Sequence, residues 1–364
     1  MEIDRTFARI HLDNLVFNYN QVQDLIGDSL VMAVVKADAY GHGSVKCARR
    51  LEANGCKFFA VASLQEAIEL REAGIKGDIL IFGRTSYINH CYLSKYNLVQ
   101  TVYSLDYAKE LNECQDTIRI HINIDTGMSR FGLYLHEDSD IKNVVEDIRK
   151  ITKLKNLNFE GIYTHFADSD DPDSDFSEVQ FTLFKKLLDN LNEVGIDPGI
   201  KHVANSAALL AYPNTYLDMV RLGIAMYGYP PVETKIEFKP VMEVFSRVTS
   251  VRGINHKDTV SYGRTYHSNQ DTNIATIAIG YADGYNRLLS NKDYLIYKNK
   301  KLPLLGRVCM DAIMVDIKDQ IIKDGDYVEV FGFNKPLMSM CDILHTIPYE
   351  LLCNVSKRVP RLYD

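Results

Sequence analysis

Short apolar runs alternate with longer amphipathic stretches from about residue 12 to about residue 230. Most of these runs are continuous rather than alternating, which is the pattern of parallel strands that are buried on both faces. The runs therefore predict strands over residues 30–35, 58–63, 78–82, 99–103, 118–124, 159–164, 201–204 and 219–224.

The clearest helix between these strands is predicted over residues 179–194. Ser177, followed three residues later by Gln180, predicts a capping box at its start, and Gly195 predicts its end. Its apolar residues recur with the helical period and form one stripe that would face a sheet. They are Phe181, Phe184, Leu187, Leu188, Leu191 and Val194.

Eight strands that alternate with helices over about 220 residues are typical of a (β/α)8 TIM barrel. The alternative is an open, doubly wound α/β sheet. The strand count favours the barrel, and so does the absence of a G-x-G-x-x-G motif. We therefore expect an α/β fold with an N-terminal TIM barrel.

The pattern changes after about residue 235, where short apolar runs are separated by Gly, Asn, Asp and Lys turns. This pattern indicates a second, mainly β domain. We therefore expect a barrel domain over residues 12–235 and a β domain over 236–364, with residues 1–11 packing on the latter. Within the β domain we predict strands over 241–252, 273–279, 294–297, 308–317 and 327–331, and a helix over 337–344.

The composition excludes several classes of protein. With 46% hydrophobic and 24% charged residues, the chain of 364 residues is an ordinary globular one. A net charge of −7 disfavours nucleic acid as a partner. No apolar run approaches the roughly 18 residues of a membrane span, and the first residues lack the pattern of a secretion signal. Seven cysteines without a C-x-x-C pair disfavour a disulfide framework or a metal site and are typical of a cytoplasmic protein.

One lysine stands where the pattern predicts the end of a strand. Lys36 directly follows five apolar residues of the first predicted barrel strand. A side chain at the C-terminal end of a barrel strand faces the active-site end of the barrel. Desolvation at such a position favours the neutral amine, which is the form that makes a Schiff base. On position alone, a lysine that extends its amine into solvent explains the residue equally well.

The residues around Lys36 resemble the cofactor-lysine motif of the alanine racemase family, since the chain reads Val-Val-Lys-Ala-Asp-Ala-Tyr-Gly-His-Gly from Val34 to Gly43. Each further match is weak by itself, but together, in family order, they identify the chain as a member of this family. The further matches are His121-Ile-Asn-Ile-Asp-Thr-Gly-Met-Ser-Arg130, Tyr163-Thr-His165-Phe166, Ala204-Asn-Ser206-Ala207, Val220-Arg-Leu-Gly-Ile224, Val260-Ser-Tyr262-Gly263, Ile279-Gly-Tyr281-Ala-Asp-Gly284, Arg307-Val-Cys-Met-Asp311 and Thr346-Ile-Pro-Tyr-Glu350.

The resemblance implies a two-base racemase. Racemisation removes the α-proton from one face of an amino acid and returns a proton to the other face, so it needs two acid/base groups and an electron sink. The family uses pyridoxal 5'-phosphate as the sink, bound as a Schiff base to the lysine that matches Lys36. Its second base matches Tyr262, which reaches the barrel of the partner subunit. The resemblance therefore implies an obligate head-to-tail homodimer.

The resemblance also assigns the cofactor's other contacts. The family places an arginine, here Arg221, against the pyridine nitrogen, and links it through His165 to the catalytic tyrosine. A guanidinium is a permanent cation that only donates, so it leaves the ring nitrogen unprotonated. On position alone, the less favoured alternative for Arg221 is an ion pair at a strand end. Ser206 can also be the N-cap of a helical turn over 207–211, and it can hold both roles at once. The remaining cofactor-binding residues that we expect are Tyr40, Asn205, Ser206, Gly223, Ile224 and Tyr349.

The substrate's carboxylate is expected to meet Arg130 and the main-chain amide of Met310, with Tyr281 and Arg307 lining the entrance. The chain departs from many relatives at Asn123, where they carry a carbamylated lysine that holds the substrate-binding arginine. Asparagine cannot be carbamylated. We therefore expect a bound anion, a chloride, near Asn123 and Arg130.

The leading hypothesis is an alanine racemase that supplies D-alanine for peptidoglycan. A serine racemase or a broad-specificity racemase of the same family is the alternative, but the bulk of Tyr349 favours alanine. A non-enzymatic pyridoxal-phosphate carrier would lack the second domain with Tyr262 and Met310. A decarboxylase of similar layout would place a carboxylate, not Arg221, at the pyridine nitrogen.

Overall fold

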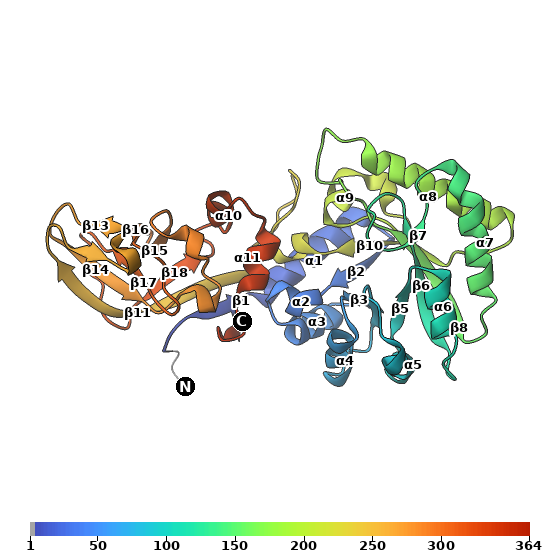
Figure 1. Ribbon diagram of the computed structural model, residues 1–364, viewed down its shortest axis with the longest axis horizontal. Coiled ribbons are helices and arrows are strands. Elements are labelled where there is room, and N and C mark those ends of the chain that lie inside the picture. Colours follow the sequence, from blue (N-terminus) through green and yellow to red (C-terminus); the bar gives the residue numbers. More distant parts are fainter. Residues whose placement is uncertain (1–3) are drawn as a thin grey trace. The chain divides into compact units, whose positions relative to one another are not determined.

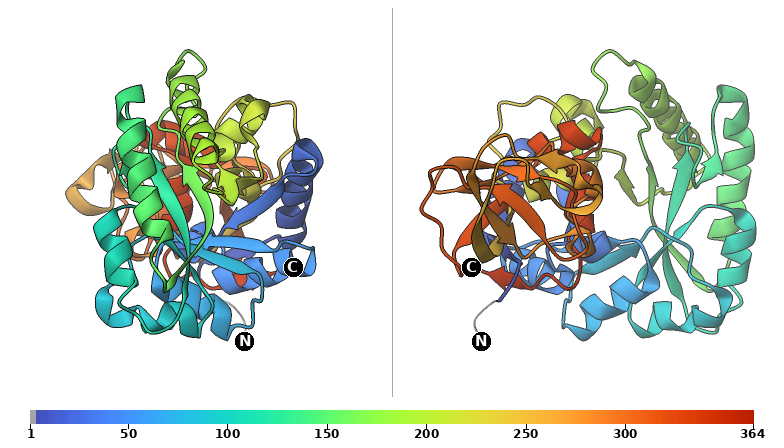
Figure 2. Two further views of the ribbon diagram at one scale, coloured as in Figure 1. Left: turned by 90° about the vertical axis from the view of Figure 1, so that its right-hand side faces the viewer. Right: turned by 60° about the vertical axis from the view of Figure 1, so that its left-hand side comes forward.

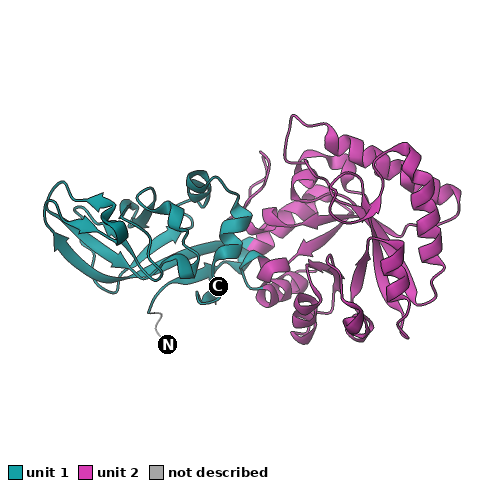
Figure 3. Cartoon of the chain, viewed as in Figure 1, with its two compact units in different colours: residues 1–14, 40–43, 240–364 teal, residues 15–39, 44–239 magenta. Residues whose placement is uncertain are grey.

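The computed structural model describes residues 4–364 (Figure 1, Figure 2) and divides into two compact units (Figure 3). The barrel unit comprises Leu15–Ala39 and Ser44–Lys239. The β unit comprises the described residues through Asn14, the short segment Tyr40–Gly43, and Pro240–Asp364.

The predicted eight-stranded barrel is confirmed. Its strands pair in parallel in the order β10-β2-β3-β4-β5-β6-β8-β9, and a two-residue strand, β7, pairs with β6. The ring closes between β9 and β10, where the N–H of Arg221 donates to the carbonyl of Ala204 at 2.9 Å. The strands are β2 (Leu30–Val34), β3 (Phe58–Val61), β4 (Asp78–Ile81), β5 (Val99–Val102), β6 (Ile118–Asp125), β7 (Leu133–Tyr134), β8 (Leu157–Thr164), β9 (Ile200–His202) and β10 (Met219–Leu222).

The helices of the barrel unit surround these strands (Figure 2). In α7 the buried residues recur at helical spacing, so the stripe covers the strands and the charged face meets solvent. The predicted end of α8 is confirmed, because Gly195 adopts φ +73° directly after the C-cap residue Val194. The helices are α1 (Leu12–Ile26), α3 (Ser44–Ala53), α4 (Leu64–Glu72), α5 (Cys91–Lys95), α6 (Leu105–Leu111), α7 (Ile141–Thr152), α8 (Phe176–Glu193) and α9 (Ser206–Ala211).

The predicted capping box of α8 is wrong. The helix begins before Ser177, and its N-cap is Asp175. The buried Gln180 side chain instead donates to the hydroxyl of Thr126 and to the carbonyl of His165, both at 3.1 Å. Gln180 therefore satisfies polar groups at the ends of β6 and β8, and tertiary contacts replace the local cap.

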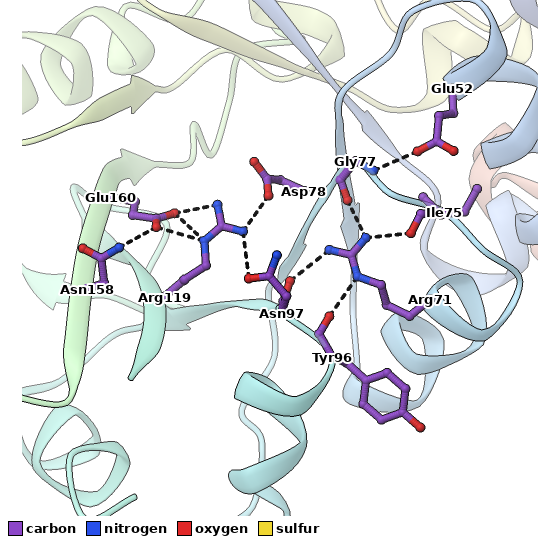
Figure 4. A network of polar contacts seen from close by, with 10 residues as sticks. All are labelled: Glu52, Arg71, Ile75, Gly77, Asp78, Tyr96, Asn97, Arg119, Asn158 and Glu160. Atoms are coloured by element: carbon purple, nitrogen blue, oxygen red, sulfur yellow. Dashed lines mark hydrogen bonds and ion pairs between the residues drawn. The ribbon is translucent and has the colours of Figure 1, made fainter. Parts of the chain in front are cut away.

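Two arginines cross-link the N-terminal ends of the barrel strands (Figure 4). Arg119 of β6 binds Asp78 of β4 at 2.6 Å and Glu160 of β8 at 2.8 Å, and these carboxylates raise the pKa of its guanidinium. Arg71 donates to four main-chain carbonyls of neighbouring loops at 2.7–2.9 Å. The polar contacts at this end are thus structural, and the opposite end, where the strands' carboxyl ends lie, is left for the site.

The predicted C-terminal β domain is confirmed as an eight-stranded sheet in the order β14-β17-β16-β15-β18-β11-β1-β19, with a separate β12–β13 hairpin. β1 pairs with β11 in antiparallel register and with β19 in parallel register. The strands are β1 (Phe7–Ile10), β11 (Met242–Ile254), β12 (Thr259–Val260), β13 (Tyr266–His267), β14 (Thr272–Ile277), β15 (Tyr294–Tyr297), β16 (Lys300–Leu305), β17 (Ile313–Asp316), β18 (Tyr327–Phe331) and β19 (Arg361–Tyr363).

The strand predicted over 308–317 is shorter than expected. Only β17 is a strand, because the N–H of Cys309 donates to the carbonyl of Ala312 and closes a turn. The helix predicted over 337–344 is confirmed as α10 (Met338–Leu344), whereas α11 (Pro348–Asn354) was not predicted. Across residues 4–364, none of the helices combines the length and apolar character of a membrane span.

Candidate active site

Lys36 precedes a left-handed turn. The short helix α2 (Lys36–Tyr40) contains Ala37, Asp38 and Ala39 at φ 51–53° and ψ 47–51°. A left-handed conformation costs about 1–2 kcal/mol for each residue with a Cβ atom, and strain of this kind concentrates at functional sites. The turn places the half-buried Lys36 at the carboxyl end of β2.

One side chain of α4 and one of the turn itself hold this strained turn. A carboxylate oxygen of Glu66 in α4 accepts from the N–H of Ala37 at 2.8 Å. A carboxylate oxygen of Asp38 accepts from the N–H of Ser44 at 2.7 Å, at the start of α3. These charge-assisted bonds stabilise the strained conformation locally.

Arg221 lies at the end of β10 and is 3% exposed. Its two terminal nitrogens donate to the carbonyls of Thr164, His202 and Val203 at 2.8–3.0 Å, and to a ring nitrogen of each of two histidines. Burial lowers the pKa of the guanidinium to about 10, so it stays charged at neutral pH. Within residues 4–364, no carboxylate pairs with Arg221 and no protein group accepts from its Nε–H.

The Arg221 guanidinium determines which ring nitrogen carries the proton in three histidines. Because arginine only donates, Nδ1 of His165 (3.1 Å) and Nδ1 of His202 (3.0 Å) are acceptors, and both rings carry their proton on Nε2. His202 then donates to Nδ1 of His121 at 2.9 Å. Burial and the charge of Arg221 hold the pKa values of His165 and His202 well below the usual value, and burial lowers that of His121 to about 3.

A buried tyrosine packs beside this chain of groups. The ring of Tyr163 stacks on His202, with centroids 4.7 Å apart and planes at 13°, and lies 5.2 Å from the guanidinium carbon of Arg221. Its hydroxyl bonds that of Thr101 at 3.1 Å, and burial raises its pKa. No role was predicted for Tyr163, His202 or His121, although Tyr163 and His121 stand in the family matches. The signal that could have singled them out is a polar side chain within an apolar strand.

We expect acid to destabilise the protein through the buried histidines. His121 and His202 stay neutral in the folded state, but the unfolded chain protonates them below about pH 6.5. Their contribution to stability is lost as pH falls through that value, by up to about 1.4 kcal/mol per histidine and pH unit. Urea unfolding at pH 7, 6 and 5 should show this slope, and a shallower one for His121→Phe; equal slopes would contradict the expectation.

Ser206 and the segment after β10 form a second set of hydrogen-bonded residues, in addition to that around Arg221. The hydroxyl of Ser206 accepts from the N–H of Gly223 at 2.9 Å and from that of Ala225 at 3.5 Å, where η4 (Ile224–Tyr227) begins. The alternative that Ser206 caps α9 is wrong, because Asn205 is the N-cap. The side-chain oxygen of Asn205 accepts from two amides of α9 and from the hydroxyl of Ser169.

Arg130 and Asn123 belong to β6 and the loop that follows it. Arg130 is exposed, and its charge, like that of Lys36, contributes to the lowered pKa of His165. The amide nitrogen of the buried Asn123 donates to the carbonyl of Phe131 at 2.8 Å. Its side-chain oxygen is buried and has no hydrogen-bond donor in the part of the chain that the structure describes.

In the β unit, Tyr262 stands on a turn of the β12–β13 hairpin and is 70% exposed. The hydroxyl of the preceding Ser261 donates to the carbonyl of Arg307 at 2.6 Å. Gly263 has φ +69°, and a Cβ atom there would lie 3.1 Å from the Arg307 guanidinium. The fold of the β unit thus brings Tyr262 and Arg307 together.

The other predicted residues of the β unit form two groups. Tyr281 and Met310 are 44% and 52% exposed, and the N–H of Tyr281 donates to the carbonyl of Cys309 at 3.0 Å. The rings of Tyr40 and Tyr349 lie 5.9 Å apart by their centroids. Burial, more than the neighbouring Tyr349, raises the pKa of Tyr40.

Comparison with known proteins decides the family. Residues 10–231 match the N-terminal domain of alanine racemase, and residues 241–363 match its C-terminal domain. The chain belongs to the alanine racemase family. It is an enzyme of the isomerase class, a racemase.

Relatives of this family resemble the chain over its full length. An alanine racemase of Clostridium tetani is 41% identical over 98% of this chain and 95% of its own. The structure of an alanine racemase from Clostridium difficile matches with a TM-score of 0.94 and 38% identity, covering 100% and 96% of the two chains. That of a Bartonella henselae alanine racemase with covalently bound pyridoxal phosphate matches with a TM-score of 0.89 and 29% identity, covering 99% of each chain.

Proposed function

We propose that this protein is a pyridoxal 5'-phosphate-dependent alanine racemase that interconverts L- and D-alanine and supplies D-alanine for peptidoglycan in the cytoplasm. The observation that carries the proposal is the setting of Arg221. Four of its five N–H groups are bonded to protein carbonyls and neutral histidines, whereas its Nε–H has no acceptor among residues 4–364. A buried, charged donor of this kind fits an unprotonated pyridine nitrogen.

The remaining donors fit the other parts of this cofactor. Lys36 offers an amine for a covalent bond at the carboxyl end of β2. The phosphate would lie between the start of α9 and the turn after β10, the usual phosphate position of a barrel. The hydroxyl of Ser206 accepts from the N–H of Gly223 and keeps its own hydrogen to donate, and Asn205, Gly223 and Ile224 would complete this site. Tyr40 and Tyr349 would add two phenols. When bound, the cofactor supplies the electron sink for the α-carbon of the substrate.

Two bases would then move the α-proton. Lys36 serves one face of the substrate, and Tyr262 of the partner subunit serves the other. An ordinary phenol keeps its proton until about pH 10, so Tyr262 needs a nearby donor to stabilise its charged form. His165 fits this part, because Nδ1 accepts from Arg221 and leaves Nε2–H to donate. The 70% exposure of Tyr262 leaves it available to a second subunit, which supports a head-to-tail homodimer.

The substrate would be held by its carboxylate. The guanidinium of Arg130 and the main-chain amide of Met310 of the partner subunit are the donors, with the partner's Tyr281 beside them. The bulk of Tyr349 restricts the side chain of the substrate and favours alanine. One added hydroxyl is hard to reject, so we expect slower turnover of serine as well.

An anion near Arg130 is a separate proposal. Asn123 cannot be carbamylated, so another negative charge is needed to hold Arg130. The amide nitrogen of Asn123 already donates to the carbonyl of Phe131, so Arg130 would be the donor that holds the anion. Bromide substituted for chloride in crystals should give an anomalous peak within hydrogen-bond distance of Arg130. A map without a peak there would contradict the proposal.

Arg221→Glu is expected to slow racemisation and to increase half-transamination. A carboxylate at this position would share a proton with the pyridine nitrogen, so negative charge would persist longer in the cofactor's ring and a proton could be returned to the wrong carbon. The products of that side reaction are pyruvate and the aminated cofactor. Pyruvate formed per D-alanine formed measures the effect, and an unchanged ratio would refute the role given to Arg221.

A further inference from the structure

The side-chain carboxylate of Asp283 is buried in the β unit. The side chain of Asp283 is 2% exposed, at the end of η6 (Tyr281–Asp283). One of its oxygens accepts from the N–H of Gly280 at 2.9 Å, which fixes the turn that carries Tyr281. A buried charge requires partners, and here the partners are cations from both ends of the chain.

Two arginines connect Asp283 to the loop that carries Met310. Arg358 places Nε 3.1 Å from Asp283 and donates from Nη2 to the carboxylate of Asp311 at 2.8 Å. Arg5 places Nη2 3.3 Å from Asp283 and 3.1 Å from the carbonyl oxygen of Asp311. Each arginine therefore bridges the same two residues, one from η6 and one from the 309–311 loop.

Main-chain hydrogen bonds between η6 and the 309–311 loop orient the N–H of Met310. The carbonyl of Cys309 accepts from the N–H of Tyr281, and that of Met310 accepts from the N–H of Ala282, at 3.0 and 3.1 Å. Since C=O and N–H point in opposite directions across a trans peptide, the N–H of Met310 points away from η6. No described residue accepts from that N–H. A side chain at Gly280 would collide with these carbonyls, since its Cβ would lie 2.3 Å from the nearest.

We propose that Arg5, Asp283 and Arg358 form a clamp that positions the Met310 amide to bind the substrate's carboxylate. The three are positioning residues, and the inference rests on the proposed function. The clamp holds the 309–311 loop against η6, so that the N–H of Met310 is oriented before the substrate binds. Its loss leaves the groups of the reaction intact but costs binding of the carboxylate.

The test compares Arg358→Met and Arg358→Lys with wild-type holoenzyme. The probes are propionate, which is alanine without its amino group, and ethylamine, which is alanine without its carboxylate. For Arg358→Met we expect the KM for alanine and the Kd for propionate to rise about tenfold, with kcat per cofactor-loaded site changed less than threefold and the Kd for ethylamine unchanged. Arg358→Lys keeps the charge but cannot span both carboxylates, so it should lie between.

Asp311→Ala gives an independent variant, because it removes the acceptor at the other end of the Arg358 bridge. Combining it with Arg358→Met should raise the KM no further than the larger single change. Arg252→Met, on an exposed end of β11, is the matched control and should behave as wild type. An unchanged KM in Arg358→Met, or equal weakening of propionate and ethylamine, would overturn the clamp. Absence of alanine racemisation by the wild type would overturn the proposed function instead.

Discussion

Replacing Lys36 with alanine is expected to abolish racemisation of alanine, with a loss of at least about 10³-fold in kcat in both directions. Lys36 is assigned two roles, covalent attachment of the cofactor and proton transfer on one face of the substrate. No other amine in the described barrel unit replaces it at the carboxyl end of β2. D-alanine formed from L-alanine, and the visible absorbance of the bound cofactor, measure the two roles.

Two controls separate this chemistry from misfolding. Lys57→Ala removes an exposed lysine just before β3 and should retain wild-type activity. Added methylamine should restore part of the activity of Lys36→Ala, because a free amine can enter the space of the lost side chain. Full activity of Lys36→Ala without added amine would refute the assignment.

Tyr262→Phe is expected to lower racemisation by about 10³-fold while leaving the cofactor bound to Lys36. The variant keeps the base on one face only. It should therefore exchange the α-proton of one enantiomer of alanine with deuterated water without converting that enantiomer into the other. NMR of the α-proton of each enantiomer measures this, and equal exchange of both would contradict a two-base mechanism.

Mixing the two inactive variants tests whether sites are shared between subunits. A dimer of one Lys36→Ala chain and one Tyr262→Phe chain would have one site with both bases and one site with neither. Random reassociation makes about half of the dimers mixed, so about a quarter of all sites should be active. Activity that stays at the level of the separate variants would show that Tyr262 acts within its own chain.

Much of the fold could be predicted because the barrel strands are buried on both faces. A strand such as β2 is then a continuous apolar run, visible without any knowledge of its neighbours. The errors arose where tertiary contacts override local preference. Gln180 bonds groups at the ends of β6 and β8 instead of capping α8, and the 308–312 segment turns to meet η6 instead of extending β17.

Less of the candidate site than of the fold could be predicted from the sequence. Lys36 was suggested by its place at a strand end, whereas Tyr262 is one aromatic residue among 22 tyrosines and only the family motif singles it out. The supporting residues could not be found in this way. His202 matters because Arg221 donates to it, and Arg358 because it bridges two loops distant in sequence. Such roles depend on contacts that no local pattern encodes.

The contacts of Arg221 also favour racemisation over the other reactions that pyridoxal 5'-phosphate supports. A carboxylate at the pyridine nitrogen would favour reactions that keep charge in the ring for longer. The donor-only guanidinium, held by neutral His165 and His202, disfavours them. In the proposed mechanism Arg221, whose charge adds to burial in lowering the pKa values of both histidines, would thereby restrict the chemistry to proton removal and return.

The most direct test of this account is the turnover of L-alanine and L-serine at equal concentration by the purified holoenzyme. Chiral chromatography follows the D-enantiomer of each, with Lys36→Ala as the blank. We predict rapid formation of D-alanine until both enantiomers are equal, slower formation of D-serine, and neither product in the blank. Absence of D-enantiomer from both substrates would contradict the racemase assignment, and faster formation of D-serine would contradict alanine as the main substrate.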